Sequence, residues 1–203
     1  MTPRRITLVA LIGIIFVALV LSPLVLRVLA PTSASTLDAG SEMAFWPAPD
    51  FSLTTQAGET LTSDDLDGLF WIATFGFTTC PGICPAMTHE MKRLHDRYAN
   101  EDRVRFLFIS VDPANDTPEV LAAYAQDYGA DTDRWHFLTG EAAHIQSLSA
   151  EGFKVGTVVN PSNHSSRFVL TGPNGMILGF YDSLDGDQMR ALEQTLDAAL
   201  ARR

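Results

Sequence analysis

The spacing of apolar residues changes along the chain in a way that predicts alternating strands and helices. Apolar runs typical of buried strands occur at residues 69–75, 104–111 and 135–138. After the first two runs, apolar residues recur at helical spacing, and a third helix is predicted from Glu141 to about Ser149. Strands that alternate with helices imply right-handed crossovers and a mainly parallel sheet.

Both ends of this unit read as antiparallel hairpins. The first is predicted from residues 51–53 and 59–61, and the second from residues 167–170 and 176–180, joined by a Gly-Pro-Asn-Gly turn. A closing helix is predicted from about Asp187. This order of elements, built around a strand that leads into two cysteines, is that of an α/β, thioredoxin-like domain.

Two helices have apolar faces that predict which side chains point inward. In the helix after residue 85 these are Met87, Met91, Leu94 and Tyr98. In the next helix, Thr117 caps the start, and the predicted inward residues are Val120, Leu121, Tyr124 and Tyr128. Methionines 87 and 91 share the apolar stripe, so we assign them to the core rather than to a metal site.

The N-terminal part has a different pattern. Ile6 to Leu26 is a run of 21 residues without a charge, long enough as a helix to cross about 30 Å of hydrocarbon. We therefore predict a cytoplasmic stub and transmembrane anchor at 1–29, a flexible tether at 30–49, and the folded domain at 50–203. Arg4 and Arg5 favour an inside N-terminus, which predicts a single-pass protein of the bacterial inner membrane with its domain in the periplasm.

Charge narrows the classes of partner. All 24 acidic residues follow residue 30, against 14 − 3 = 11 Lys and Arg, so that part carries a formal charge of 11 − 24 = −13. Such a surface excludes nucleic acid as a partner.

The candidate chemistry lies in the only two cysteines, Cys80 and Cys84, which directly follow the first buried strand. A thiol pair at this position can form a disulfide or chelate a soft metal ion. A purely structural disulfide is the alternative, but so short a loop removes little entropy from the unfolded chain. Pro85 predicts a helix start there with Cys84 at its cap, and the positive helix end is then expected to lower the pKa of the Cys84 thiol.

Two sulfurs leave a soft ion under-coordinated, so we expect a third ligand among five histidines. His164 is the candidate, because it precedes the strand at 167–170. If that strand runs antiparallel beside the first buried strand, its beginning lies next to the cysteines. The others, His89, His95, His136 and His144, are assigned packing or surface roles. Asp112 and Asp116 close a strand and cap a helix, and either is a candidate for orienting a site residue.

Three separated motifs carry a family resemblance. They are the segment Thr74 to Pro85 with both cysteines, Ser110-Val111-Asp112-Pro113 with Asp116-Thr117-Pro118-Glu119, and His164-Ser165 before a strand and a Gly-Pro-Asn-Gly turn. Together they resemble the Sco/SenC copper metallochaperones, over a region from about Phe51 to the C-terminus.

The resemblance implies copper, as Cu(I) and also as Cu(II), held by Cys80, Cys84 and His164. It implies assembly of the dinuclear copper centre of cytochrome c oxidase, with subunit II as partner and a copper-donor protein as another. Thr79 and Gly82 stand where the family usually has His and Asp, which alters the surroundings of the metal. A membrane-anchored thiol:disulfide oxidoreductase or thiol peroxidase-like enzyme, and a copper or redox sensor, are the alternatives. We expect a metallochaperone rather than an enzyme.

Overall fold

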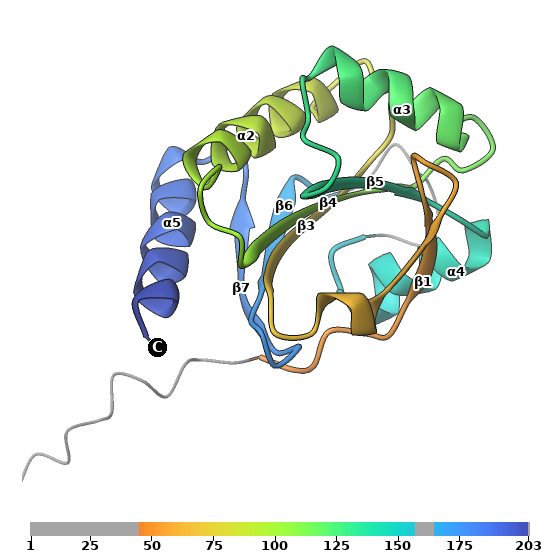
Figure 1. Ribbon diagram of the computed structural model, residues 1–203. Coiled ribbons are helices and arrows are strands. Elements are labelled where there is room, and N and C mark those ends of the chain that lie inside the picture. The colour runs from red at the N-terminus through yellow and green to blue at the C-terminus, as the bar shows by residue number, and fades with distance from the viewer. Residues whose placement is uncertain (1–44, 157–164, 203) are drawn as a thin grey trace, which may run out of the picture. The chain divides into compact units, whose positions relative to one another are not determined.

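The fold is built on one seven-stranded sheet. The computed structural model describes residues 45–156 and 165–202. The strand order is β2-β1-β5-β4-β3-β6-β7, so β3, which leads to the cysteines, lies inside the sheet between β4 and β6 (Figure 1). The strands are β1 (Ser52–Thr55), β2 (Thr60–Thr62), β3 (Phe70–Gly76), β4 (Val104–Ser110), β5 (Trp135–Thr139), β6 (Arg167–Thr171) and β7 (Ile177–Asp182).

The sheet is less parallel than the sequence predicts. Of the six pairings in the described residues, only β3 with β4 and β4 with β5 are parallel. The expectation of a mainly parallel sheet is wrong, because it was based only on the strands that are linked by helices. The two hairpins, which the sequence predicts correctly, add antiparallel strands at both edges.

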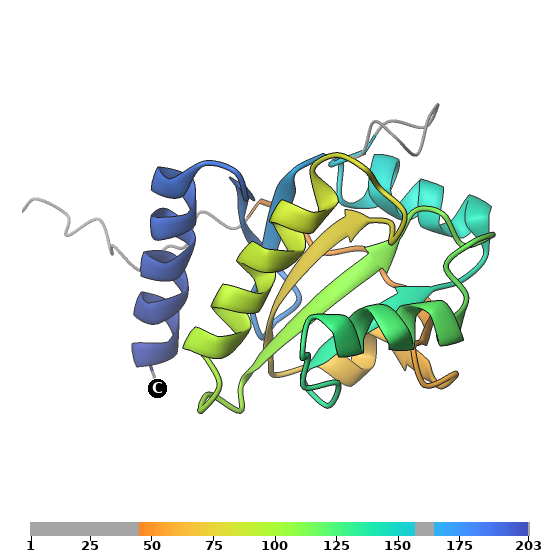
Figure 2. The same ribbon diagram turned by 90° about the horizontal axis from the view of Figure 1, so that it is seen from above.

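Helices cover both faces of the sheet. The α-helices are α2 (Cys84–Arg97), α3 (Pro118–Asp127), α4 (Ala142–Ser147) and α5 (Gly186–Ala201), with a 3₁₀ turn at Ser63–Leu66 and a π turn at Leu148–Gly152. In Figure 1, α2 and α3 lie on one side of the central strands and α4 on the other. Seen from above in Figure 2, α5, α2 and α3 follow one another along their face.

Each face has its own apolar core. Met87, Met91 and Leu94 of α2 pack against sheet residues of one core, and Ile145 of α4 belongs to the other. Both methionines are fully buried, so their core assignment is confirmed. Val120 is 39% exposed and not inward as predicted, because α3 buries Leu121 and Ala125 instead.

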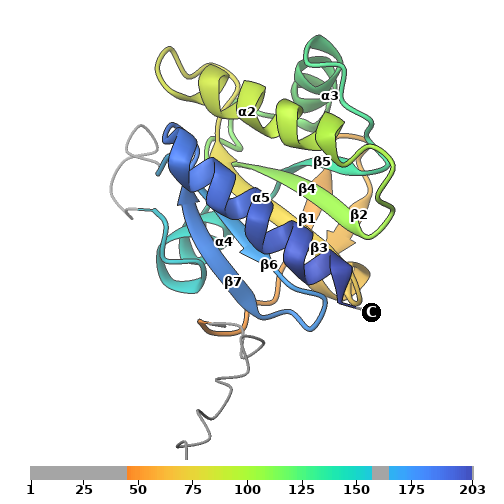
Figure 3. The ribbon, with the colours of Figure 1, turned by 90° about the vertical axis from the view of Figure 1, so that its left-hand side faces the viewer.

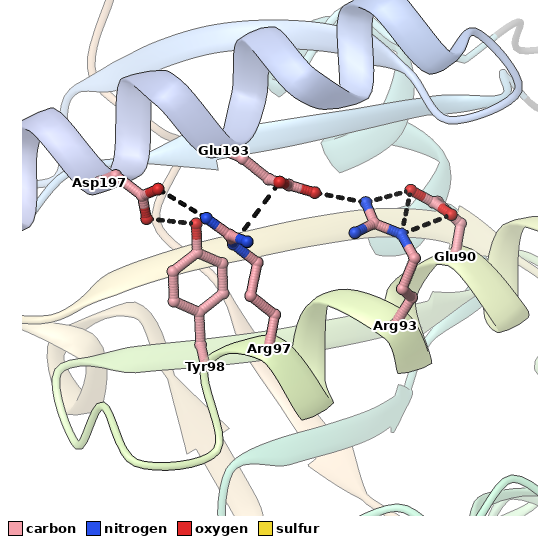
Figure 4. Close-up of polar contacts among 6 residues, drawn as sticks. All are labelled: Glu90, Arg93, Arg97, Tyr98, Glu193 and Asp197. Carbon is pink, nitrogen blue, oxygen red and sulfur yellow. Dashed lines mark hydrogen bonds and ion pairs between the residues drawn. The ribbon is translucent and has the colours of Figure 1, made fainter.

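Charged side chains fasten α2 to α5, which run alongside each other in Figure 3. Arg93 contacts Glu193 at 2.6 Å, and Arg97 contacts Glu193 at 3.5 Å and Asp197 at 2.8 Å (Figure 4). The Tyr98 hydroxyl also donates to Asp197. Pairs of this kind contribute roughly 0.2–1 kcal/mol each. They add to the apolar contacts that hold α2, and with it Cys84, on the sheet.

The described chain begins on the edge of the sheet rather than in a free tether. Phe45 donates its N–H to Ile177, Ile177 donates to Trp46, and Ala48 donates to Gly175. Residues 45–48 therefore belong to the ordered domain, because this segment pairs with the chain around the start of β7. The predicted anchor, residues 1–29, lies outside the described residues. Within residues 45–156 and 165–202, no helix has the length and apolar character needed to span a membrane.

Candidate functional site

The cysteine pair lies at the junction of β3 and α2. All seven residues of β3 are buried, and its last residue, Gly76, pairs with Ser110 at the end of β4. The loop that follows carries Cys80, which is half-exposed, and leads to Cys84, which is 1% exposed. No disulfide joins the two cysteines in this structure. The end of β3 is thus followed by one partly exposed thiol and one buried thiol.

The start of α2 buries Cys84. Ile83 is the N-cap, Cys84 the first helical residue and Pro85 the second, one position earlier than the sequence predicts. The Cys84 sulfur packs against the backbone of Gly76, where an added Cβ would lie 3.2 Å from it. A side chain at position 76 would therefore compete with the thiol for this space.

Burial controls the ionisation of Cys84. It raises the pKa of the Cys84 thiol to about 12, although the Phe77 N–H acts in the opposite direction, and the nearby Cys80 and Asp116 raise the pKa further. The expectation that the helix end lowers this pKa is wrong, because a thiolate at this position would lose its hydration. Cys84 is the proton-carrying member of the pair.

Cys80 has the opposite tendency. Partial burial raises the pKa of Cys80, but backbone N–H groups of Cys84, Gly82 and Ile83 and the thiol of Cys84 outweigh it, and the net pKa is lowered. The pair therefore consists of a thiolate-prone outer sulfur and a protonated inner sulfur joined by a hydrogen bond. Such a pair can attack a disulfide through Cys80, or bind a soft cation with release of the Cys84 proton.

The third predicted ligand, His164, lies outside the described residues. The premise of its assignment is confirmed: β6 is antiparallel to β3, with Ala73 paired to Val169. The Thr74 hydroxyl, near the cysteine end of β3, donates to the carbonyl of Arg167, the first residue of β6. The chain that follows His164 therefore enters the sheet beside the end of β3.

His95 and His89 of α2 both contact aromatic rings. His95 is buried, with its ring centre 5.6 Å from that of Phe106 and 5.5 Å from that of Trp135. His89 lies on the exposed side of α2 in contact with the ring of Tyr128. No cluster of three or more His, Cys, Asp or Glu residues suited to a metal occurs among residues 45–156 and 165–202.

A fixed contact to the cysteine loop comes from Asp116. Its carboxylate accepts hydrogen bonds from the backbone and hydroxyl of Thr78, two residues before Cys80. Asp112, the other acidic candidate, accepts from Asn115 within its own loop. The sequence names both residues without separating them, since only the fold turns Asp116 toward the cysteines.

Comparison with known proteins identifies the family. The SCO1/SenC family model matches residues 44–200, which is most of the chain. The chain belongs to the SCO1/SenC family. A Bacillus subtilis protein named SCO1 protein homolog is 36% identical over 142 residues, covering 66% of this chain and 73% of the relative.

Solved structures of Sco proteins share this fold. BsSco, described as a member of the Sco family of cytochrome c oxidase assembly proteins and as having a disulfide switch, matches with a TM-score of 0.67 and 32% identity, covering 76% of this chain and 94% of that one. Arabidopsis thaliana ScoI with copper bound matches with a TM-score of 0.63 and 26% identity, covering 74% of this chain and 98% of that one. The thioredoxin-like fold predicted from the order of elements is confirmed as the Sco fold.

Proposed function

We propose that this protein is a copper metallochaperone that binds one copper ion through Cys80, Cys84 and His164. The main observation behind the proposal is that the thiols of Cys80 and Cys84 lie within hydrogen-bond distance of each other, just after a buried strand, in a Sco protein. Two sulfurs and an imidazole suit Cu(I), which is stable with few, soft ligands. Copper is the cargo of this protein rather than a resident cofactor.

In this proposal the copper is delivered to the dinuclear centre of cytochrome c oxidase, with subunit II as the receiver. Membership of the same family as BsSco, described as an oxidase assembly protein, supports the process. We include in the proposal a single-pass anchor at residues 1–29 in a bacterial inner membrane and a periplasmic domain, on the basis of the uncharged run at 6–26.

Metal loading uses the asymmetry of the two thiols. The Cys80 thiolate is the first donor, because its pKa is lowered. The Cys84 thiol joins by giving its proton to solvent, so that one Cu(I) replaces one proton. Because Cys84 is buried and protonated, both the binding and the release of Cu(I) depend on this exchange of a proton for copper.

A thiol:disulfide oxidoreductase is the second candidate, favoured by the same asymmetry. The Cys80 thiolate would attack a partner disulfide and form a mixed disulfide, with one partner thiolate leaving. Cys84, on losing its proton, would then attack the Cys80 sulfur, which gives the intramolecular disulfide and a partner with both cysteines reduced.

Copper stoichiometry tests the proposal. The full-length reduced protein, purified in detergent, is expected to bind one equivalent of Cu(I) tightly, and Cys80→Ser, Cys84→Ser and His164→Ala each to lose it. His89→Ala is the control, because that ring lies on the exposed side of α2. If His164→Ala kept tight binding, the three-ligand site would be refuted. If the wild type bound no copper yet reduced partner disulfides, the oxidoreductase would replace the chaperone.

A further inference from the structure

Asp116 is a buried carboxylate that the copper site as proposed does not use. It lies between β4 and α3, with 0% of its surface exposed. Its oxygens accept from the Ser110 hydroxyl at 2.5 Å, the Thr78 hydroxyl at 2.5 Å and the Thr78 backbone N–H at 3.1 Å. Within the described part of the chain, Asp116 forms no ion pair. A buried carboxylate without a cation is costly, and its hydrogen bonds must compensate for the lost hydration.

Those hydrogen bonds join three parts of the fold. Ser110 ends β4 and is paired in register with Gly76, the last residue of β3. Val111 continues this pairing by donating its N–H to the Gly76 carbonyl. Thr78 belongs to the cysteine loop itself. Asp116 therefore fastens the loop to the end of the sheet two residues after it leaves β3.

The other end of the loop is fixed independently. Cys84 is in the first turn of α2, where the Thr88 hydroxyl donates to the Cys84 carbonyl and contacts the Tyr124 hydroxyl at 2.9 Å. With Thr78 held by Asp116 and Cys84 held by the helix, the position of Cys80 is limited by a short span attached at both ends.

We propose that Asp116 is a positioning residue for the thiol pair, acting through Thr78 to hold the Cys80 sulfur within reach of Cys84. Without this attachment the loop gains conformational freedom, and the two sulfurs meet less often. Both reactions that need them together, closing the Cys80–Cys84 disulfide and chelating a soft cation, then become less favourable. The chelation part rests on the proposed function, whereas the disulfide part does not.

The test uses the full-length protein and two substitutions at Thr78. Thr78→Val keeps the shape of the side chain but removes the hydrogen bond from its hydroxyl to Asp116, whereas Thr78→Ser keeps the hydroxyl. Since the chain has only two cysteines, its thiol–disulfide equilibrium with glutathione reports this pair alone. From the strength of hydrogen bonds to charged groups, we expect Thr78→Val to shift this equilibrium toward the dithiol by about tenfold, and Thr78→Ser to stay near the wild type. Asp116→Ala should shift it at least as far as Thr78→Val.

A control is available in the turn between β2 and β3. Asp65 accepts from both the N–H and the hydroxyl of Thr62, at 2.8 and 2.7 Å, so the same two donor groups bind a carboxylate at an exposed position away from the cysteines. Thr62→Val is expected to lower the urea midpoint without moving the disulfide equilibrium. The proposal is overturned if Thr78→Val likewise changes only the midpoint, or if Thr78→Ser fails to restore the equilibrium.

Copper binding provides a separate readout. Thr78→Val should weaken Cu(I) binding by a similar factor, measured against a chromophoric chelator. If the wild-type protein bound no Cu(I), the proposed function would fail, while the glutathione equilibrium would still decide the role of Asp116.

Discussion

Gly76 gives the sharpest test of how closely the sheet packs against the inner thiol. We predict that Gly76→Ala weakens Cu(I) binding by about ten- to a hundredfold, the range found when the support of a metal ligand is disturbed. An added Cβ would lie 3.2 Å from the Cys84 sulfur and 3.0 Å from the nearest ring carbon of Phe108. Ordinary carbon contacts lie at about 3.5–4.0 Å, so both neighbours must give way by a few tenths of an ångström.

Phe108 has little room to give way, so the added methyl group is expected to press on the Cys84 sulfur as well. Phe108 is buried, and its ring packs against those of Tyr124 and Phe137, with centres 5.5 and 5.6 Å away. Metal–ligand distances tolerate about 0.2 Å, less than the displacement required here. Overpacking should also cost about 1–3 kcal/mol in the free energy of unfolding of the metal-free protein.

The assay for Gly76→Ala is competition for Cu(I) with a chromophoric chelator, alongside urea unfolding without metal. Gly82→Ala is the control, because a Cβ there would lie 3.9 Å from the Cys80 sulfur, an ordinary contact. Equal copper affinity in Gly76→Ala, Gly82→Ala and the wild type would refute the argument that Gly76 makes room for the buried sulfur.

Three further predictions follow from charge and burial. In the reduced, metal-free protein at neutral pH, limiting iodoacetamide should alkylate Cys80 before Cys84, since the pKa of Cys80 is lowered and that of Cys84 raised to about 12; peptide mass spectrometry showing Cys84 modified first would contradict this. Glu193→Gln should lower the free energy of unfolding by about 0.5–1 kcal/mol, because Glu193 contacts two arginines of α2. The loss should shrink in about 1 M salt, and a loss that salt leaves unchanged would argue against an electrostatic origin. Stability should fall as the pH drops below about 6.5, because burial lowers the pKa of His95 and of His136 from that value, so the unfolded chain binds protons first. Urea midpoints at several pH values should show a smaller fall in His95→Gln, and an equal fall would exclude His95 as a source.

The sequence by itself determined the elements and their order. Strand runs, helical spacing, the cap at Thr117 and the Gly-Pro-Asn-Gly turn are local signals, and each predicted element is present, although α3 turns Ala125 rather than Val120 inward. Local signals also located the thiol pair, because a buried strand followed by two cysteines is visible without the fold. His164 and the membrane anchor remain predictions from sequence.

Only the tertiary structure decided how the two thiols ionise and which residue holds their loop. The helix start alone suggests a low pKa for Cys84, but burial beside Gly76 removes water from its sulfur and reverses the direction of the pKa shift. Similarly, the sequence leaves Asp112 and Asp116 equivalent, and the fold brings only Asp116 to the loop that carries Cys80. Burial and long-range hydrogen bonds depend on which segments meet, and that information is spread over the whole chain rather than held in any short stretch of it.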